Sequence, residues 1–172
     1  MRFEIVHSFD APLEKVEEAV LGEPFLAYLR QHHSQMMEAA AQSIESEGDR
    51  VRRKVRYRPK PIIEKIGPKR VPPEWMAWIE ESTYDRRRHV LDFRNVPTVR
   101  RVADLLENRG TMRFSADGPT RTRRVIEGEL KVKVFVLGAI AERIIHKQAE
   151  GLLAEEARLL QRFLREGTAT AP

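Results

Sequence analysis

The stretch AIAERIIHKQAEGLLAEEARLLQRFLRE, residues 139–166, decides the fold. Its apolar side chains recur at the three- and four-residue spacing of one helix face. A helix of about 28 residues is roughly 40 Å long, enough to cross a whole domain. We therefore predict one long C-terminal helix whose apolar stripe the rest of the chain must cover. The stripe consists of Ile140, Ile144, Ile145, Ala149, Leu152, Leu153, Ala157, Leu160, Phe163 and Leu164.

The segments before this helix alternate in polarity every second residue, which is typical of half-buried strands. Residues 2–9 predict a first strand, and Pro12 and Pro24 each introduce a short helix. Residues 59–73 hold five of the ten prolines and predict an irregular connection with an apolar insert, and residues 98–107 a connection with helical character. Further strands are predicted at residues 36–44, 51–58, 75–84, 89–96, 111–116 and 122–133.

This order contains no parallel crossover and only one large helix to cover the sheet. We therefore predict an α+β helix-grip fold, in which a curved antiparallel sheet of about six to seven strands wraps round the C-terminal helix. Two short helices follow the first strand. Residues 1–167 are expected to form a single domain and residues 168–172 a disordered tail.

Two local motifs carry a resemblance to a known superfamily. The run FDAPLEKV, residues 9–16, resembles the strand-to-helix entry of START-like proteins, which include lipid-binding, polyketide-cyclase and pollen-allergen-type members. Residues 127–142, EGELKVKVFVLGAIAE, resemble a bacterial branch of that superfamily with no known function. The resemblance implies the helix-grip fold and a hydrophobic cavity more firmly than it implies a reaction.

The amino-acid composition excludes several kinds of functional site. The sequence has no Cys, which excludes disulfides, thiolate zinc sites and cysteine nucleophiles and fits a reducing compartment, so we expect a cytoplasmic protein. The nine Gly form no phosphate-binding loop and the five His no metal-ligand spacing, so we expect no cofactor and no metal. The longest apolar stretch, residues 134–141, is too short to span a bilayer.

The net charge of +5 is unevenly distributed. Residues 50–133 carry 23 Lys and Arg against 11 Asp and Glu, so the strands are basic and the flanks acidic. A basic sheet surface could attract an anionic membrane or a polyanion. Nucleic acid is disfavoured because no aromatic platform or helix-turn-helix pattern accompanies the cations. The cations in question are Arg52, Lys54, Arg56 and Arg58, with Arg121, Arg123 and Arg124.

A bent sheet and one helix leave a gap that bulky side chains or a ligand must fill. Only seven Phe, two Trp and three Tyr are available, so we predict a cavity. Gln148 is the polar residue on the helical stripe, where it would either orient a ligand or lie at the edge in water. The residues predicted to line the cavity are Ile5, His7, Phe9, Val55, Tyr57, Trp78, Leu91, Phe93, Met112, Phe114, Ile126, Leu130, Ile144, Ile145, Gln148 and Leu152.

His7 falls on the inner side of the first strand and leaves two readings open. It is either a core histidine with its hydrogen bonds satisfied or an acid–base or ligand-contacting group in the cavity. The function hypotheses follow. The first is a non-catalytic binder or carrier of a small hydrophobic ligand such as a lipid, an isoprenoid or a polyketide. The alternatives are a cyclase- or dehydratase-type enzyme that uses His7, and a polyanion-binding module. Nothing in the sequence sets an oligomeric state.

Overall fold

The computed structural model describes residues 1–169 of the 172-residue chain, the last two by their backbone alone. Residues 170–172 of the expected tail lie outside the described residues. The main elements are β1 (Arg2–Phe9), α1 (Leu13–Leu21), α2 (Glu23–His32), β2 (Met36–Glu47), β3 (Arg50–Pro59), β6 (Trp78–Asp85), β7 (Val90–Pro97), α3 (Arg100–Ala103), β8 (Leu106–Ala116), β9 (Thr122–Val132) and α4 (Gly138–Ala169).

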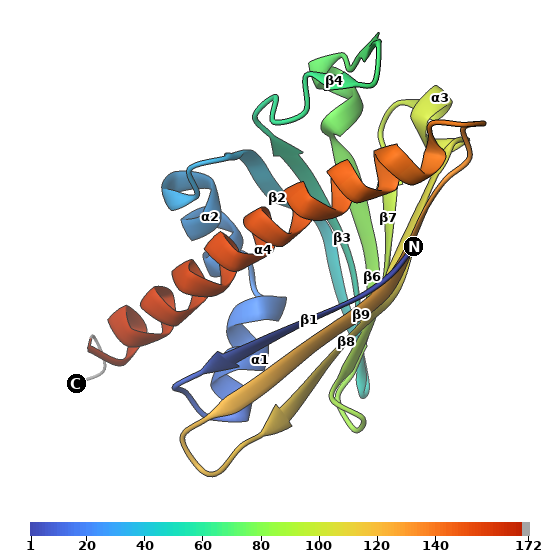
Figure 1. Ribbon diagram of the computed structural model, residues 1–172. Coiled ribbons are helices and arrows are strands. Elements are labelled where there is room, and N and C mark those ends of the chain that lie inside the picture. The colour runs from blue at the N-terminus through green and yellow to red at the C-terminus, as the bar shows by residue number, and fades with distance from the viewer. Residues whose placement is uncertain (170–172) are drawn as a thin grey trace.

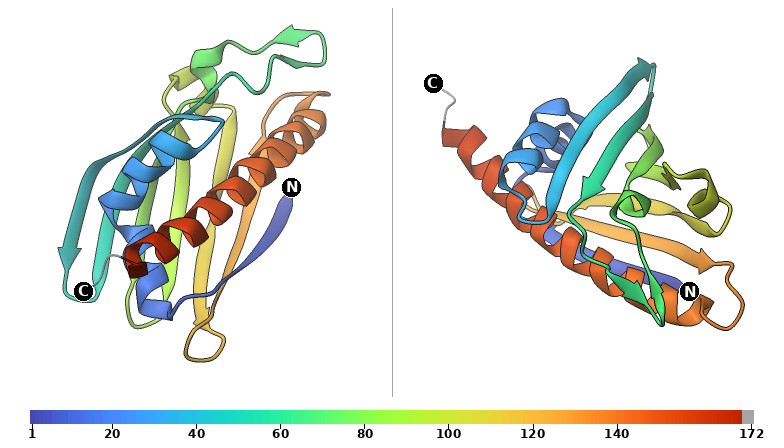
Figure 2. Two further views of the ribbon diagram at one scale, coloured as in Figure 1. Left: turned by 90° about the vertical axis from the view of Figure 1, so that its left-hand side faces the viewer. Right: turned by 90° about the horizontal axis from the view of Figure 1, so that it is seen from above.

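The long strands form one antiparallel sheet of seven strands in the order β1-β9-β8-β7-β6-β3-β2. The helix α4 crosses the concave side of this sheet diagonally, with α1 and α2 beside its C-terminal half (Figures 1 and 2). The predicted helix-grip fold, with two short helices after the first strand, is confirmed.

Two connections differ from the prediction. The strand β8 begins at Leu106 rather than Thr111, because residues 106–110 pair with the end of β9 although they carry little strand propensity of their own. The proline-rich segment contains a small hairpin, β4 (Lys65–Ile66) with β5 (Lys69–Arg70), and a 3₁₀ turn η1 (Pro73–Met76). Trp75 lies in this turn and not in a strand.

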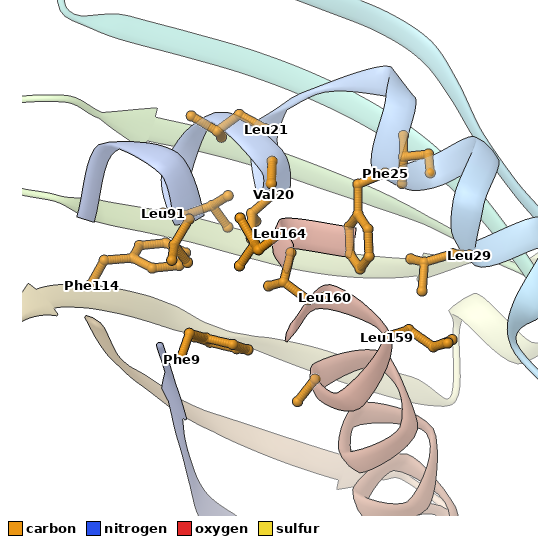
Figure 3. Packing of buried hydrophobic residues seen from close by; sticks show 14 of the residues in the cluster. Phe9, Val20, Leu21, Phe25, Leu29, Leu91, Phe114, Leu159, Leu160 and Leu164 are labelled. Carbon is orange, nitrogen blue, oxygen red and sulfur yellow. The ribbon is translucent and has the colours of Figure 1, made fainter. Parts of the chain in front are cut away.

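The densely packed core lies where the C-terminal half of α4 meets the sheet, α1 and α2 (Figure 3). There Phe9 and Phe114 from the sheet meet Phe25 from α2 and the C-terminal half of α4, whose Leu160 is fully buried. The α4 side chains in this core begin at Ala157. The N-terminal half of the helix therefore covers a different part of the interior.

A buried arginine marks the boundary between these two parts. Arg124 of β9 has no exposed surface, although the sequence places it among the surface cations; that expectation is wrong. Its Nη1 donates to Glu156 Oε1 of α4 at 2.9 Å, and its Nη2 donates to Glu156 Oε2 and, at 3.1 Å, to His7 Nδ1. Its guanidinium lies over the Phe9 ring, 5.0 Å from the centroid. A charge this deeply buried must be paired, so the contact fixes α4 on the sheet.

A pair of glycines in β8 and β9 leaves room on the inner face of the sheet for aromatic rings from the neighbouring strands β1 and β7. Gly110 and Gly128 lie opposite each other in β8 and β9. A Cβ on Gly110 would come within 2.1 Å of the Glu127 carbonyl oxygen and 2.9 Å of Phe93 Cζ, and one on Gly128 within 2.6 Å of Phe3 Cζ. The Phe3 and Phe93 rings therefore occupy the space that side chains would need, and any larger residue at either position displaces them.

The Gly110→Ala substitution tests this packing. We expect it to lower the free energy of unfolding by about 1–3 kcal/mol, because the added methyl group meets backbone atoms that cannot yield. The matched control is Gly151→Ala in α4, where nothing lies within 4 Å of the added Cβ. That change should raise stability by up to about 1 kcal/mol, since alanine is the better helix former. Urea unfolding of the three proteins measures both effects, and equal stabilities for the two variants would contradict the packing account.

The pH dependence of stability tests the His7–Arg124 contact. Burial, and then the charge of Arg124, lower the pKa of His7. Below about pH 6.5 the unfolded chain therefore binds a proton that the folded chain resists, so stability is retained at higher pH and lost as the pH falls. We expect His7→Asn, which keeps an acceptor oxygen but cannot titrate, to lose less stability than the wild type between about pH 7.5 and pH 5. Identical losses in urea unfolding would show that His7 is not held as a neutral acceptor.

Candidate functional site

A cavity of about 630 Å³ lies between the N-terminal half of α4 and the inner face of the sheet. The Phe25, Leu26 and Leu29 side chains of α2 bound one side, and Glu156 lies at the end nearest the packed core. The lining is mainly apolar. The volume and lining are those of sites that hold small organic molecules.

The structure brings most of the predicted lining residues together around this cavity. The residues that line it are Ile5, Tyr57, Trp78, Leu91, Phe93, Met112, Ile126, Leu130, Ile145, Gln148 and Leu152. Five others do not. Phe9, Val55 and Phe114 are taken up by the packed core, and Ile144 lies on the flank of the helical stripe, away from the cavity. His7 is occupied as the acceptor for Arg124.

Four polar residues that line the cavity from the seven-stranded sheet were not predicted from the sequence: Arg53, Glu80, Asn95 and Asn108. The strand register places Glu80 opposite Asn95, and Asn95 opposite Asn108, so the three form a line across β6, β7 and β8. Arg53 lies in the adjacent row, opposite Ser82. We call these four residues the polar row. Arg53 has the same two-residue spacing as the buried Val51 and Val55, and this pattern in the sequence could have identified it as an inward-facing residue.

Of the two charged members of the polar row, Arg53 is shielded from solvent and Glu80 is half-buried. Arg53 is 3% exposed, and among the described residues no carboxylate oxygen lies within 4.0 Å of its guanidinium. Burial raises the pKa of Glu80, and the positive charge of Arg53 offsets part of that rise. Burial likewise raises the pKa of the neighbouring Tyr57 hydroxyl, which therefore stays protonated. The cavity wall thus holds a cation, a carboxyl group and neutral hydroxyl and amide groups in an apolar surround.

The segment between β3 and β6, residues 60–77, covers one end of the cavity, and we call it the lid. Its Ile62, Ile63 and Ile66 side chains line the cavity, as do Val71 and Trp75. The lid approaches the start of α4, because a Cβ on Gly67 would lie 3.4 Å from Leu137 Cδ2 (Figure 2). Lys69, Arg70 and Arg101 line the cavity and are also exposed, so the cavity reaches the surface at this end.

The cationic face predicted for β3 is exposed, but acidic side chains are spread across it. Arg56 and Arg58 both pair with Glu38 of β2, at 3.1 and 3.6 Å. Lys54 pairs with Glu81 at 3.2 Å, and Arg52 with Glu47 at 3.6 Å. The positive field that the sequence predicts for this face is therefore partly offset by its own neighbours.

Two structural features are absent from residues 1–169. Within this range no three His, Asp or Glu side chains group closely enough to hold a metal ion. No helix in the same range is both long and apolar enough to cross a bilayer.

Many solved structures share this fold, and the following three are between 11% and 14% identical to the chain. The Zhui aromatase/cyclase from Streptomyces sp. R1128 superposes with a TM-score of 0.65 at 14% identity, over 96% of this chain and 93% of its own. Norcoclaurine synthase from Thalictrum flavum, in complex with dopamine and hydroxybenzaldehyde, gives 0.63 at 11% identity, over 96% and 87%. A START superfamily protein from Mycobacterium smegmatis gives 0.55 at 14% identity, over 96% and 97%.

These similarities confirm the START-like fold that the sequence motifs predict. No curated protein sequence matches the chain. A family described as protein of unknown function, DUF2505, matches residues 4–164, in agreement with the predicted branch. The chain therefore belongs to the DUF2505 family.

Proposed function

We propose that this protein binds a small hydrophobic molecule, such as a lipid, an isoprenoid or a polyketide-like compound, and carries it without chemical change. The cavity of about 630 Å³ under α4 is the observation that carries the proposal. An apolar space of this size is costly to leave empty, and a ligand would supply the missing packing contacts. The absence of Cys supports a reducing compartment, for which we propose the cytoplasm.

The structural neighbours support a ligand of modest size. One of them, norcoclaurine synthase, holds dopamine and hydroxybenzaldehyde. By analogy, a ring-bearing or chain-like molecule of similar or larger size is a reasonable occupant of the present cavity. The non-catalytic part of the proposal rests on His7, because its Nδ1 accepts from Arg124 and the residue does not line the cavity.

A cyclase- or dehydratase-type enzyme is the second candidate, and Glu80 is the observation in its favour. A half-buried carboxyl group with a raised pKa beside an apolar cavity is typical of a general acid. The two candidates differ in the fate of the ligand. A carrier returns its co-purified molecule with unchanged mass after prolonged incubation, whereas an enzyme converts it.

Filling the cavity tests ligand binding. Ala149 of α4 lines the cavity, and Ala154 of the same helix is exposed. We expect the wild type to bind the uncharged fluorescent probe N-phenyl-1-naphthylamine and Ala149→Phe to bind it at least about 10-fold more weakly, because the new ring takes the place of the ligand. Ala154→Phe is the matched control and should bind as the wild type does. A wild-type protein that purifies without ligand and ignores the probe would contradict the proposal.

We also propose that the protein exchanges its ligand at an anionic membrane surface, through the loop between β9 and α4. Phe135 is 95% exposed and Val136 77%, next to the cavity-lining Val134 and Leu137. Val136 has φ +68, a conformation that costs a β-branched residue about 1–3 kcal/mol. We call Phe135 and Val136 the apolar tip. Exposed Lys69, Arg70 and Arg101 at the same end of the cavity would attract anionic headgroups.

Vesicle binding tests the apolar tip. We expect the wild type to cosediment with vesicles of phosphatidylcholine and phosphatidylglycerol, and Phe135→Ser to bind about 10-fold more weakly, because it loses the burial of one aromatic side chain in the interface. The control is Val6→Ser, which alters an exposed apolar residue on β1. Binding that survives Phe135→Ser, or that fails equally in both variants, would rule out the tip as the contact.

A further inference from the structure

The polar row is unusual because its polar side chains lie on the wall of a cavity that is otherwise mainly apolar. On the same inner face it is flanked by Trp78, Phe93 and Leu130, and the register makes its amides direct cross-strand neighbours. A cavity meant only for hydrocarbon would place apolar side chains here, since buried polar groups stabilise a protein only when they are paired.

The hydrogen bonds of this row are incomplete. Arg53 Nε, Asn95 Oδ1 and Asn108 Oδ1 are buried and have no hydrogen-bond partner among the described residues. Arg53 is the most informative of them, because it is nine-tenths or more buried and has no ion-pair partner within 4.0 Å in the described part of the chain. Buried polar atoms of native proteins are almost always satisfied by protein, ordered water or a ligand. The row therefore has capacity for a bound group that can both accept and donate.

The charges near the row restrict what that group can be. Arg124 and Glu156 pair with each other, which leaves Arg53 and Glu80 as the cation and the acid of the polar row. The other cations that line the cavity, Lys69, Arg70 and Arg101, lie at its exposed end. A ligand carboxylate would gain from Arg53 but would meet the Glu80 and Glu156 carboxyl groups. A hydroxyl group carries one donor and two acceptor positions and no charge, so it can accept from Arg53 and donate to an Asn oxygen or to Glu80.

We propose that Arg53, Glu80, Asn95 and Asn108 form the polar subsite of the cavity and select hydrophobic molecules that carry an uncharged hydroxyl group. This inference rests on the proposed function, because it names the class of ligand that the cavity takes: a hydrophobic alcohol rather than a fatty acid or a plain hydrocarbon. Gln148 and His146 of α4, on the opposite wall, are the competing candidates for a polar contact, and His146 Nε2 is likewise buried without a hydrogen-bond partner among the described residues.

The test compares three competitors of equal chain length, dodecanol, dodecanoate and dodecane, for displacement of N-phenyl-1-naphthylamine. We expect dodecanol to displace the probe from the wild type at a concentration about 10-fold lower than either of the others, as one or two additional hydrogen bonds would give. Asn95→Leu and Asn108→Leu should each remove most of this advantage while still binding the probe. Gln148→Leu tests the competing contact, and the polar subsite predicts that the preference for dodecanol survives this change.

A second variant keeps the test independent of any folding defect in the leucine variants. Glu80→Gln preserves shape and hydrogen bonding but removes the acid, so dodecanoate should bind it about 10-fold more tightly than it binds the wild type. Probe binding without discrimination among the three competitors would overturn the polar subsite and leave the proposed carrier function standing. Loss of the preference in Gln148→Leu alone would also overturn it. Failure of the wild type to bind the probe at all would instead refute the carrier function.

Discussion

The buried ion pair between Arg124 and Glu156 is the constraint on which the interior of this protein depends. It ties β9 to the middle of α4, and no water reaches the guanidinium to compensate for a lost partner. On one side of the pair the helix packs Ala157, Leu160 and Leu164 against the sheet, and on the other it covers the cavity. Removing either partner would leave an uncompensated charge at this boundary, whereas the cavity side chains beyond it can vary without unlocking the helix. Stability and ligand space are thus assigned to different halves of one helix.

This division explains how a chain with few aromatic residues keeps an open cavity in a stable fold. Phe9, Phe25 and Phe114 belong to the packed core, whereas Tyr57, Trp75 and Trp78 line the cavity wall at the other end without filling the space between them. At the cavity end the inner face carries the glycine pair of β8 and β9, over which the rings of Phe3 and Phe93 lie. A larger residue at either glycine would meet backbone atoms, so the cavity cannot be filled from these two positions of β8 and β9. Strand packing therefore contributes to the open space together with the shortage of bulky residues.

The helices and strands could be predicted from the sequence, whereas the side-chain contacts between them largely could not. Period-two alternation located β1, β3 and β9, and the helical stripe located α4, because these patterns reflect burial on one face. The same alternation continues through Arg53 and Arg124, but Arg53 was not predicted to face inward, and a net-charge argument grouped Arg124 with the surface cations, although both are buried. The line from Glu80 through Asn95 to Asn108 could not be predicted, since it exists only through the register of three strands. The lid could not be predicted either, because its apolar residues come to cover the cavity only where the folded segment approaches Leu137.

The order of side chains along the inner face gives the proposed ligand an orientation. From the lid inward, the sheet presents Tyr57 stacked on Trp78, then the polar row, then apolar Leu91, Met112 and Ile126, and finally Arg124. A hydroxyl group held at the polar row leaves the deep apolar section for the hydrocarbon part of the ligand. The opposite orientation would bury the hydroxyl group among apolar side chains and leave the polar row unpaired. Both effects weaken binding, so this orientation is less favourable. The polar end of the ligand would then face the end of the cavity that the lid covers, where Ile66 and Trp75 line the wall.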